Sequence, residues 1–226
     1  MLKSLINLLY PEHCNGCNSQ LLETEAVLCI QCRHELPFTH QCINPENEIA
    51  KRLSGRLPLE HASSLLYFHK QGMVQQMVHN LKYRGRQEVG KLAGQLYAAE
   101  LKNAGVLQTV NEIIPVPLHP KRLRERGYNQ VTEFGRALSA GLDISYNEKL
   151  LLRTAYTKTQ TKKNLEARAG IIGSAFEVKA TEKDYNKHFL LIDDVITTGA
   201  TLESCGRLLL SIPGAKLSIV TIAYTE

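Results

Sequence analysis

The stretch that decides the fold of this chain reads Leu190-Leu191-Ile192-Asp193-Asp194-Val195-Ile196-Thr197-Thr198-Gly199-Ala200-Thr201-Leu202. Its apolar start predicts a buried strand, which delivers two adjacent carboxylates to its carboxyl end. A short loop of small, hydroxyl-bearing residues follows, and then a helix begins. An isolated Asp-Asp pair would be most simply a solvated acidic turn, but here every position contributes to one anion-binding site.

The chemistry of this loop is that of a phosphate site. A helix N-terminus presents free N–H groups and a partial positive charge, so a phosphate fits there. The hydroxyls of Thr197, Thr198 and Thr201 add donors, and Gly199 lets the backbone approach a ligand closely. The two carboxylates only accept hydrogen bonds, so they suit the hydroxyls of a ribose or the water shell of Mg²⁺.

Strands and helices alternate along most of the chain. Strand-like runs cover residues 63–68, 112–116, 189–192 and 216–224, and apolar helical faces cover residues 73–81, 89–101, 131–138 and 202–212. This order predicts an α/β fold with a mostly parallel sheet flanked by helices. Ligands of such sheets bind beyond the carboxyl ends of the strands, so we expect the acidic pair to lie there, outside the core.

A nucleotide-binding P-loop is a competing interpretation. An apolar run that ends in Asp-Asp also resembles a Walker B strand, and residues 85–91 match the glycine and lysine spacing of a Walker A loop. However, Leu92 stands where a magnesium-binding Ser or Thr is required. Lys91 also falls inside an amphipathic helical pattern with no strand before it, so we reject this interpretation.

A second informative stretch covers residues 113–130, where a short strand ends in prolines and a basic loop follows. Proline fixes φ and so stiffens the loop. Lys121, Arg122 and Arg126 supply the cationic donors that a pyrophosphate leaving group requires. For Arg124 we favour a solvated surface position.

The composition excludes several classes of protein. Lys and Arg number 27 against 22 Asp and Glu, a formal charge of +5 that suits anionic ligands and is too small to imply nucleic-acid binding alone. No apolar run reaches the roughly 18 residues of a membrane span. At the N-terminus, Leu2, Leu5, Ile6 and Leu9 recur at helical spacing, which favours a short amphipathic helix over a signal peptide. We therefore expect a cytoplasmic protein.

Four of the six cysteines form two C-x-x-C pairs, namely Cys14, Cys17, Cys29 and Cys32. In a reducing cytosol this spacing predicts one structural Zn²⁺ held by four thiolates, with a redox dithiol pair as the less favoured alternative. His13, His34 and Cys42 are spare candidates that we leave outside the ligand set, and Cys205 lies on an apolar helical face. We expect a zinc ribbon over residues 1–45 and a second domain over residues 58–226.

Residues 190–202 closely resemble the signature of the type I phosphoribosyltransferases. The resemblance implies that Asp193 and Asp194 hold the ribose of phosphoribosyl pyrophosphate with Mg²⁺, and that residues 197–201 grip its 5′-phosphate. Together with the residue chemistry, it assigns ligand binding to Lys82, Pro117, Leu118, His119, Lys121, Arg122, Asp193, Asp194, Thr197, Thr198, Gly199, Ala200 and Thr201. Catalysis is assigned to Asp193, Asp194 and Arg126.

Further motifs resemble the competence protein F family. They are the P-x-P pattern of residues 115–117 with Arg126-Gly127-Tyr128-Asn129-Gln130, the element Lys82-Tyr83-Arg84-Gly85, and an approximate match at residues 153–168. The N-terminal zinc ribbon extends this likeness over almost the whole chain. Many relatives carry a further C-x-x-C pair, where this chain has only His40 and Cys42, so we expect no second metal site.

The family resemblance implies a link to natural transformation and leaves three functions open. The first is a phosphoribosyltransferase with an unknown acceptor. The second is a non-catalytic module that binds single-stranded DNA or a DNA-uptake helicase through its basic residues, including Lys158, Lys162 and Lys163. The third and weakest is a transcriptional regulator with the same fold. The acidic pair favours retained ligand binding, but it does not separate catalysis from sensing.

Overall fold

The computed structural model describes residues 11–154 and 175–226. Two sequence expectations lie outside these residues. They are the amphipathic helix within residues 1–10 and most of the family-like segment, including Lys158, Lys162 and Lys163. In the described part, no helix is long and apolar enough to cross a membrane.

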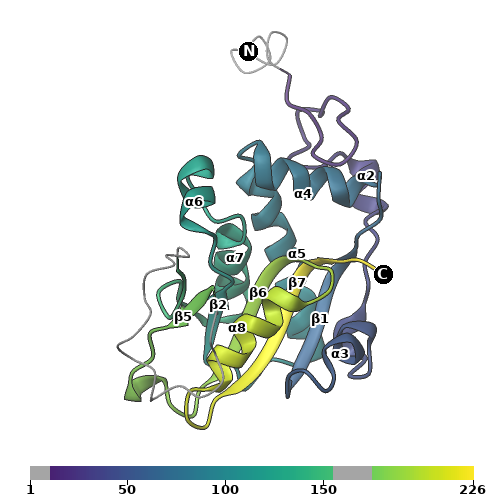
Figure 1. Cartoon of the computed structure of the whole chain (residues 1–226). Coiled ribbons are helices and arrows are strands. Elements are labelled where there is room, and N and C mark those ends of the chain that lie inside the picture. The colour runs from purple at the N-terminus through teal and green to yellow at the C-terminus, as the bar shows by residue number, and fades with distance from the viewer. Residues whose placement is uncertain (1–10, 155–174) are drawn as a thin grey trace.

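A parallel five-stranded sheet forms the centre of the molecule, in the order β1-β7-β6-β2-β3 (Figure 1). The strands are β1 (His61–Tyr67), β2 (Glu112–Pro115), β3 (Ser145–Tyr146), β6 (His188–Ile196) and β7 (Lys216–Tyr224). Every pair of neighbours runs parallel, as the alternation of strands and helices predicted. β6 lies in the middle, so its carboxyl end is bordered by β7 on one side and β2 on the other.

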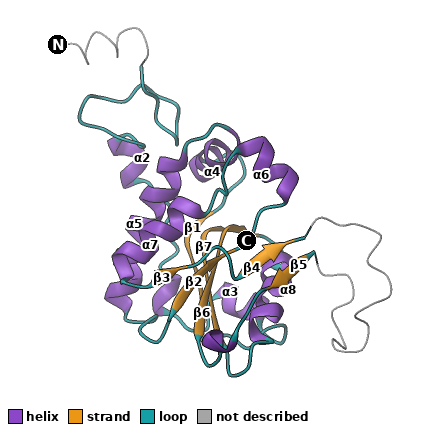
Figure 2. Cartoon of the chain, turned by 90° about the vertical axis from the view of Figure 1, so that its left-hand side faces the viewer, coloured by secondary structure: helices purple, strands orange, loops and turns teal. Residues whose placement is uncertain are grey.

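Helices cover both faces of this sheet (Figure 2). One face packs against α4 (Met73–Tyr83), α5 (Gln87–Ala104) and α7 (Thr132–Leu142), and the other against α3 (Glu48–Leu53) and α8 (Ala200–Leu210). Alternate side chains of β6 enter the two cores: Leu190 and Ile192 pack with α4, α5 and α7, whereas Leu191 packs with α3 and α8. The predicted α/β fold is confirmed.

The remaining elements are short. They are α2 (Ile30–His34), a 3₁₀ turn at Gln41–Ile43, α6 (Pro120–Arg126), the antiparallel pair β4 (Leu151–Arg153) and β5 (Phe176–Val178), and a 3₁₀ turn at Glu182–Asp184. The segment between the two predicted domains is ordered and contains α3. Cys14 and Cys32, from the predicted ribbon, share a hydrophobic cluster with Leu65 and Leu81 of the α/β part.

Two details differ from the sequence expectations. The strand β6 runs on to Ile196, so the acidic pair lies within the strand and Asp194 is only 4% exposed. The basic run is the helix α6 and not a loop. His119 caps its N-terminus, Pro120 occupies its first turn, and Gly127 ends it at φ 78°. These are ordinary signals for the start and end of a helix, which the sequence analysis did not use because it interpreted the run of basic residues as a loop. Residues 85–91, by contrast, place Lys91 inside α5, which confirms that no P-loop exists there.

Candidate ligand-binding site

The acidic pair divides its two side chains between the two faces of the sheet. Asp194 points to the face covered by α4, where its Oδ1 atom forms an ion pair with Lys82 Nζ at 2.9 Å. Its other oxygen, Oδ2, is buried and has no hydrogen-bond partner among the described residues. The backbone N–H of Asp194 donates to Asp193 Oδ1 at 2.8 Å. One buried carboxylate oxygen is therefore left available to a ligand or a metal ion.

Lys82, one of the predicted ligand-binding residues, thus contacts the acidic pair. It stands in the last turn of α4, whose apolar residues Met77, Val78 and Leu81 fix the helix against the sheet. The side chain of Lys82 is 23% exposed and that of Asp194 is 6% exposed, so the pair is largely shielded from solvent. A partly desolvated ion pair of this kind holds both groups in place.

Burial and the neighbouring charge of Asp194 raise the pKa of Asp193 to about 8, against its ordinary value of 3.8. Positive charge on Lys82 and Arg153 acts in the opposite direction. Arg153 ends β4, lies over the ring of Phe176 at 5.0 Å, and keeps a buried Nε atom without a hydrogen-bond partner in the described part of the chain. Perturbed carboxyls of this kind concentrate at functional sites.

The loop after β6 forms the second half of the site. Thr197, Thr198 and Thr201 are exposed, while Gly199 is buried and adopts φ 77° at the start of α8. A Cβ atom on Gly199 would lie 2.9 Å from Leu53 Cδ2, so a larger residue would have to displace that side chain and adopt a positive φ that favours glycine. Among the described residues, no acceptor is bound to the N–H groups of Thr198, Gly199 or Thr201. The loop therefore presents free donors, hydroxyls and a helix N-terminus at one place.

Two arginines hold this loop, Arg52 on α3 and Arg56 in the turn that follows α3, and no sequence pattern pointed to either. Arg52 Nη1 donates to the carbonyl oxygen of Thr197 at 2.6 Å, and Arg56 Nη1 donates to that of Thr198 at 2.7 Å. Arg52 stands on α3, whose Ile49 and Leu53 are buried, and Arg56 stands in the turn after the end of that helix. In sequence, both look like ordinary charged residues of a surface helix and its exit turn.

The residues around α6 are placed more loosely. Pro117, Leu118 and His119 are partly buried, whereas Lys121 and Arg122 are exposed, and Lys121 pairs with Glu125 at 4.0 Å. No hydrogen bond or ion pair of the described residues joins Lys121 or Arg122 to the acidic pair.

Arg126 lies nearer to the site than the rest of the basic run. Its guanidinium lies 5.0 Å from the ring centre of Tyr83, the residue next to Lys82, and donates to Gln130 Oε1 at 2.9 Å. The neighbouring Tyr128 hydroxyl donates to the carbonyl oxygen of Leu81 on α4. The start of the R-G-Y-N-Q motif is thereby fastened to the helix that carries Lys82.

The four cysteines predicted to bind zinc come together. The sulfur atoms of Cys14, Cys17, Cys29 and Cys32 all lie within 4.8 Å of one another. Zn–S bonds of about 2.3 Å in a tetrahedron require sulfur atoms about 3.8 Å apart, so this donor set suits a zinc ion. Backbone N–H groups of Gly16 and Cys29 approach Cys14 Sγ at 3.4 and 3.3 Å, which is typical of a thiolate metal knuckle. These thiols could hold one zinc ion.

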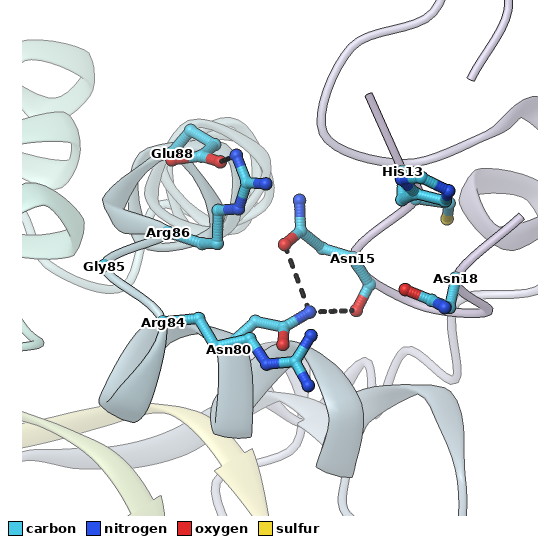
Figure 3. Close-up of a pocket in the computed structure, with 9 residues that line it drawn as sticks. His13, Asn15, Asn18, Asn80, Arg84, Gly85, Arg86 and Glu88 are labelled. Atoms are coloured by element: carbon cyan, nitrogen blue, oxygen red, sulfur yellow. Dashed lines mark hydrogen bonds and ion pairs between the residues drawn. The ribbon is translucent and has the colours of Figure 1, made fainter. Parts of the chain in front are cut away.

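A polar cavity of about 420 Å³ separates this cysteine cluster from the turn between α4 and α5 (Figure 3). His13, Asn15 and Asn18 line it from one side, and Arg84 and Arg86 from the other. At its edge, Asn80 Nδ2 donates to both oxygens of Asn15, at 3.3 and 3.2 Å. Both asparagines are buried, so the cysteine knuckle is tied directly to the helix that carries Lys82.

No protein-family model matches the chain. The DNA utilization protein YhgH of Shigella flexneri is 27% identical over 215 residues, which cover 94% of this chain and 90% of that protein. Competence protein F of Haemophilus influenzae is 27% identical over 205 residues, covering 87% of this chain and 90% of that protein. A solved hypoxanthine phosphoribosyltransferase of Staphylococcus aureus superposes on 60% of this chain and 62% of its own, with 19% identity and a TM-score of 0.35.

The parallel sheet, the acidic pair near the end of β6 and the small-residue loop before α8 define the class. It is an α/β protein with a parallel five-stranded sheet flanked by helices and a four-cysteine cluster before the sheet. The two curated relatives named above match it along 90% of their own length. These matches confirm the resemblance of the chain to the competence protein F family.

Proposed function

We propose that the chain binds phosphoribosyl pyrophosphate together with Mg²⁺ and transfers the phosphoribosyl group to an acceptor. The observation that carries this proposal is the pairing of two carboxylates on β6 with a following loop in which the N–H groups of Thr198, Gly199 and Thr201 have no acceptor among the described residues. The ribose hydroxyls donate to Asp193 and Asp194, and the 5′-phosphate accepts from the loop donors. The buried free oxygen of Asp194 supports this arrangement, because a buried acceptor requires a partner.

In the transfer, the bond between the anomeric carbon and pyrophosphate breaks, the acceptor forms a bond to the same carbon, and the acceptor releases a proton. The anomeric carbon gains oxocarbenium character, so the protein's task is to position the ligand and stabilise the departing phosphates. Mg²⁺, held by the oxygens of the acidic pair, would supply positive charge to those phosphates. Arg126, Lys121 and Arg122 supply further cationic donors, from the residues that follow Pro117, Leu118 and His119.

Substitution in the loop tests the ligand site. Thr198→Glu places a bulky anion where the phosphate is expected, and it should abolish binding of phosphoribosyl pyrophosphate measured by calorimetry with Mg²⁺. Ser204→Glu is the matched control, because Ser204 is exposed on the same helix and its hydroxyl binds only the helix carbonyl of Ala200. Normal binding by Thr198→Glu would show that the site is misassigned. Screening nucleobases and other amines for pyrophosphate release would then identify the acceptor.

A non-catalytic role in DNA uptake is the second candidate, with single-stranded DNA or a helicase as the partner. The observation that favours it is the exposed basic surface of α6, formed by Lys121, Arg122 and Arg124, together with the names of the relatives. Under this hypothesis, Arg122→Ala with Arg124→Ala should weaken binding of single-stranded DNA and flatten its salt dependence, while Thr198→Glu should have no effect. Titration of both variants with DNA and with the small ligand separates the two candidates.

We also infer that residues 1–45 form a zinc ribbon, that residues 58–226 form the ligand-binding domain, and that the protein acts in the cytoplasm, where thiols stay reduced. Elemental analysis of purified protein should give about one zinc per chain. Absence of metal, with all four thiols freely titratable in the folded protein, would contradict the zinc assignment.

A further inference from the structure

Arg52 of α3 and Arg56 of the turn after α3 contact the loop through its carbonyl groups and not through its hydroxyls. Arg52 Nη1 donates to the carbonyl oxygens of Thr197 and Thr225, at 2.6 and 2.7 Å, and its Nη2 donates to the Tyr224 hydroxyl at 3.0 Å. Its guanidinium also lies 4.6 Å from the ring centre of Tyr224. One side chain thus fastens the loop after β6 to the end of β7.

Arg56 repeats this contact one peptide further along. Its Nη1 donates to the carbonyl oxygen of Thr198 at 2.7 Å, while Nε and Nη2 bind Glu203 on α8 at 2.7 and 2.5 Å. Because Glu203 offsets its charge, Arg56 acts on the loop mainly through a directed hydrogen bond. The two arginines therefore fix two successive peptide groups of the loop.

Fixing the carbonyl oxygens also fixes the N–H groups. A peptide group is planar and trans, so its C=O and N–H point in opposite directions. The carbonyls of Thr197 and Thr198 point toward α3, and the N–H groups of Thr198 and Gly199, which share those peptide planes, point away from it. Those are the N–H groups that lack acceptors among the described residues. Gly199 is the residue at which such a loop turns most freely, since glycine populates both signs of φ.

We propose that Arg52 and Arg56 are positioning residues that aim the N–H groups of Thr198 and Gly199 at the 5′-phosphate. This inference rests on the proposed function, since it names what orients the phosphate loop of that same site. The arginines act through the peptide groups and do not touch the ligand. Their loss should therefore impair recognition of the 5′-phosphate and leave recognition of the pyrophosphate group intact.

The principal test is Arg52→Met in the full chain, because no ion pair joins Arg52 to an acidic residue in the described parts. Two probes are titrated by calorimetry with Mg²⁺: ribose 5-phosphate, which carries the 5′-phosphate, and inorganic pyrophosphate, which does not. Arg52→Met should weaken ribose 5-phosphate binding by about tenfold or more, and pyrophosphate binding should stay unchanged. Arg56→Met should show the same split, and Arg56→Lys should restore part of the affinity because it keeps one donor for the Thr198 carbonyl.

Arg207→Met is the matched control. Arg207 binds the same Glu203, at 2.8 Å, but contacts no carbonyl of the loop. It should leave both affinities unchanged. Each titration is repeated at high salt, because a simple loss of surface charge is screened over about 10 Å at 0.1 M salt, whereas a misdirected N–H group is not. Urea denaturation confirms that each variant is folded.

Hydrogen exchange supplies a readout that needs no ligand. In the free protein, Arg52→Met should speed exchange of the amides of residues 198–201, whereas Arg207→Met should not.

If Arg52→Met and Arg56→Met bind ribose 5-phosphate like the unmodified chain, or lose pyrophosphate affinity equally, the positioning role is wrong while the proposed function stands. If the unmodified chain binds neither ribose 5-phosphate nor phosphoribosyl pyrophosphate, the proposed function itself fails, and the positioning role with it.

Discussion

Replacement of Asp193 by asparagine should make the ligand-free protein more stable above pH 8. Burial beside Asp194 raises the pKa of the Asp193 carboxyl from 3.8 to about 8. Between these two values the folded chain binds a proton that the unfolded chain has released. The folded state therefore binds more protons, and the stability of the protein falls as the pH rises through this window. Asparagine cannot ionise, so the variant should lack this loss.

The size of the effect follows from the same shift. A tenfold change in a protonation equilibrium is worth about 1.4 kcal/mol, so a rise from 3.8 to about 8 sets a ceiling of roughly 6 kcal/mol. Asp193 keeps part of its contact with solvent, which weakens the interaction with Asp194. We therefore expect a gain of about 2 kcal/mol for the variant at high pH. Asparagine Oδ1 can still accept the N–H of Asp194, so the local structure should persist.

The assay is urea denaturation of both proteins at pH 5, 7 and 9 in the absence of ligand. The difference in free energy of unfolding between the variant and the unmodified chain should grow as the pH rises. Glu23→Gln, which removes an exposed carboxyl far from β6 in sequence, controls for the loss of one charge. A difference that is constant across this range, or a variant that is less stable at pH 9, would refute the reasoning. The same variant should lose affinity for phosphoribosyl pyrophosphate, which separates a functional carboxyl from a structural one.

Three further predictions concern the loop, the core and the cysteine cluster. Gly199→Ala should cost about 1–3 kcal/mol more in urea than Gly55→Ala, because both glycines have positive φ but only Gly199 has a neighbour within 3 Å of a new Cβ; equal costs would contradict this. Burial lowers the pKa of His61 to about 4, so stability should fall as the pH drops from about 6.5 to 4, and His61→Gln should reduce that slope in thermal melts. Asn80→Ala should speed metal loss to a chelator, since it leaves the buried oxygens of Asn15 without a donor at a cost of about 1–3 kcal/mol; unchanged loss would show that the knuckle stands independently of α4.

The sequence by itself determined the strands, helices and turns that residues close together in the chain specify. Residues 190–202 contain a buried strand, a carboxylate pair and a loop that only small residues can form, and the structure builds a strand, a loop and a helix from them. The two C-x-x-C pairs likewise specify a cluster of sulfur atoms, because each tight turn brings two thiols together. Alternating strands and helices specified a parallel sheet, since crossover helices are the usual connection between parallel strands.

The tertiary structure alone decided which distant groups meet at these elements. Lys82 reaches Asp194 because α4 and β6 pack face to face, and the extra length of β6 buries a carboxyl that the sequence pattern placed outside the core. Arg52 and Arg56 look like solvated surface residues in the sequence, and only the fold brings α3 and the turn after it to the loop after β6, across about 145 residues of chain. Hydrogen bonds between groups so far apart in sequence depend on how whole helices and strands pack together. Hydrophobic periodicity predicts each helix or strand by itself and does not predict that packing.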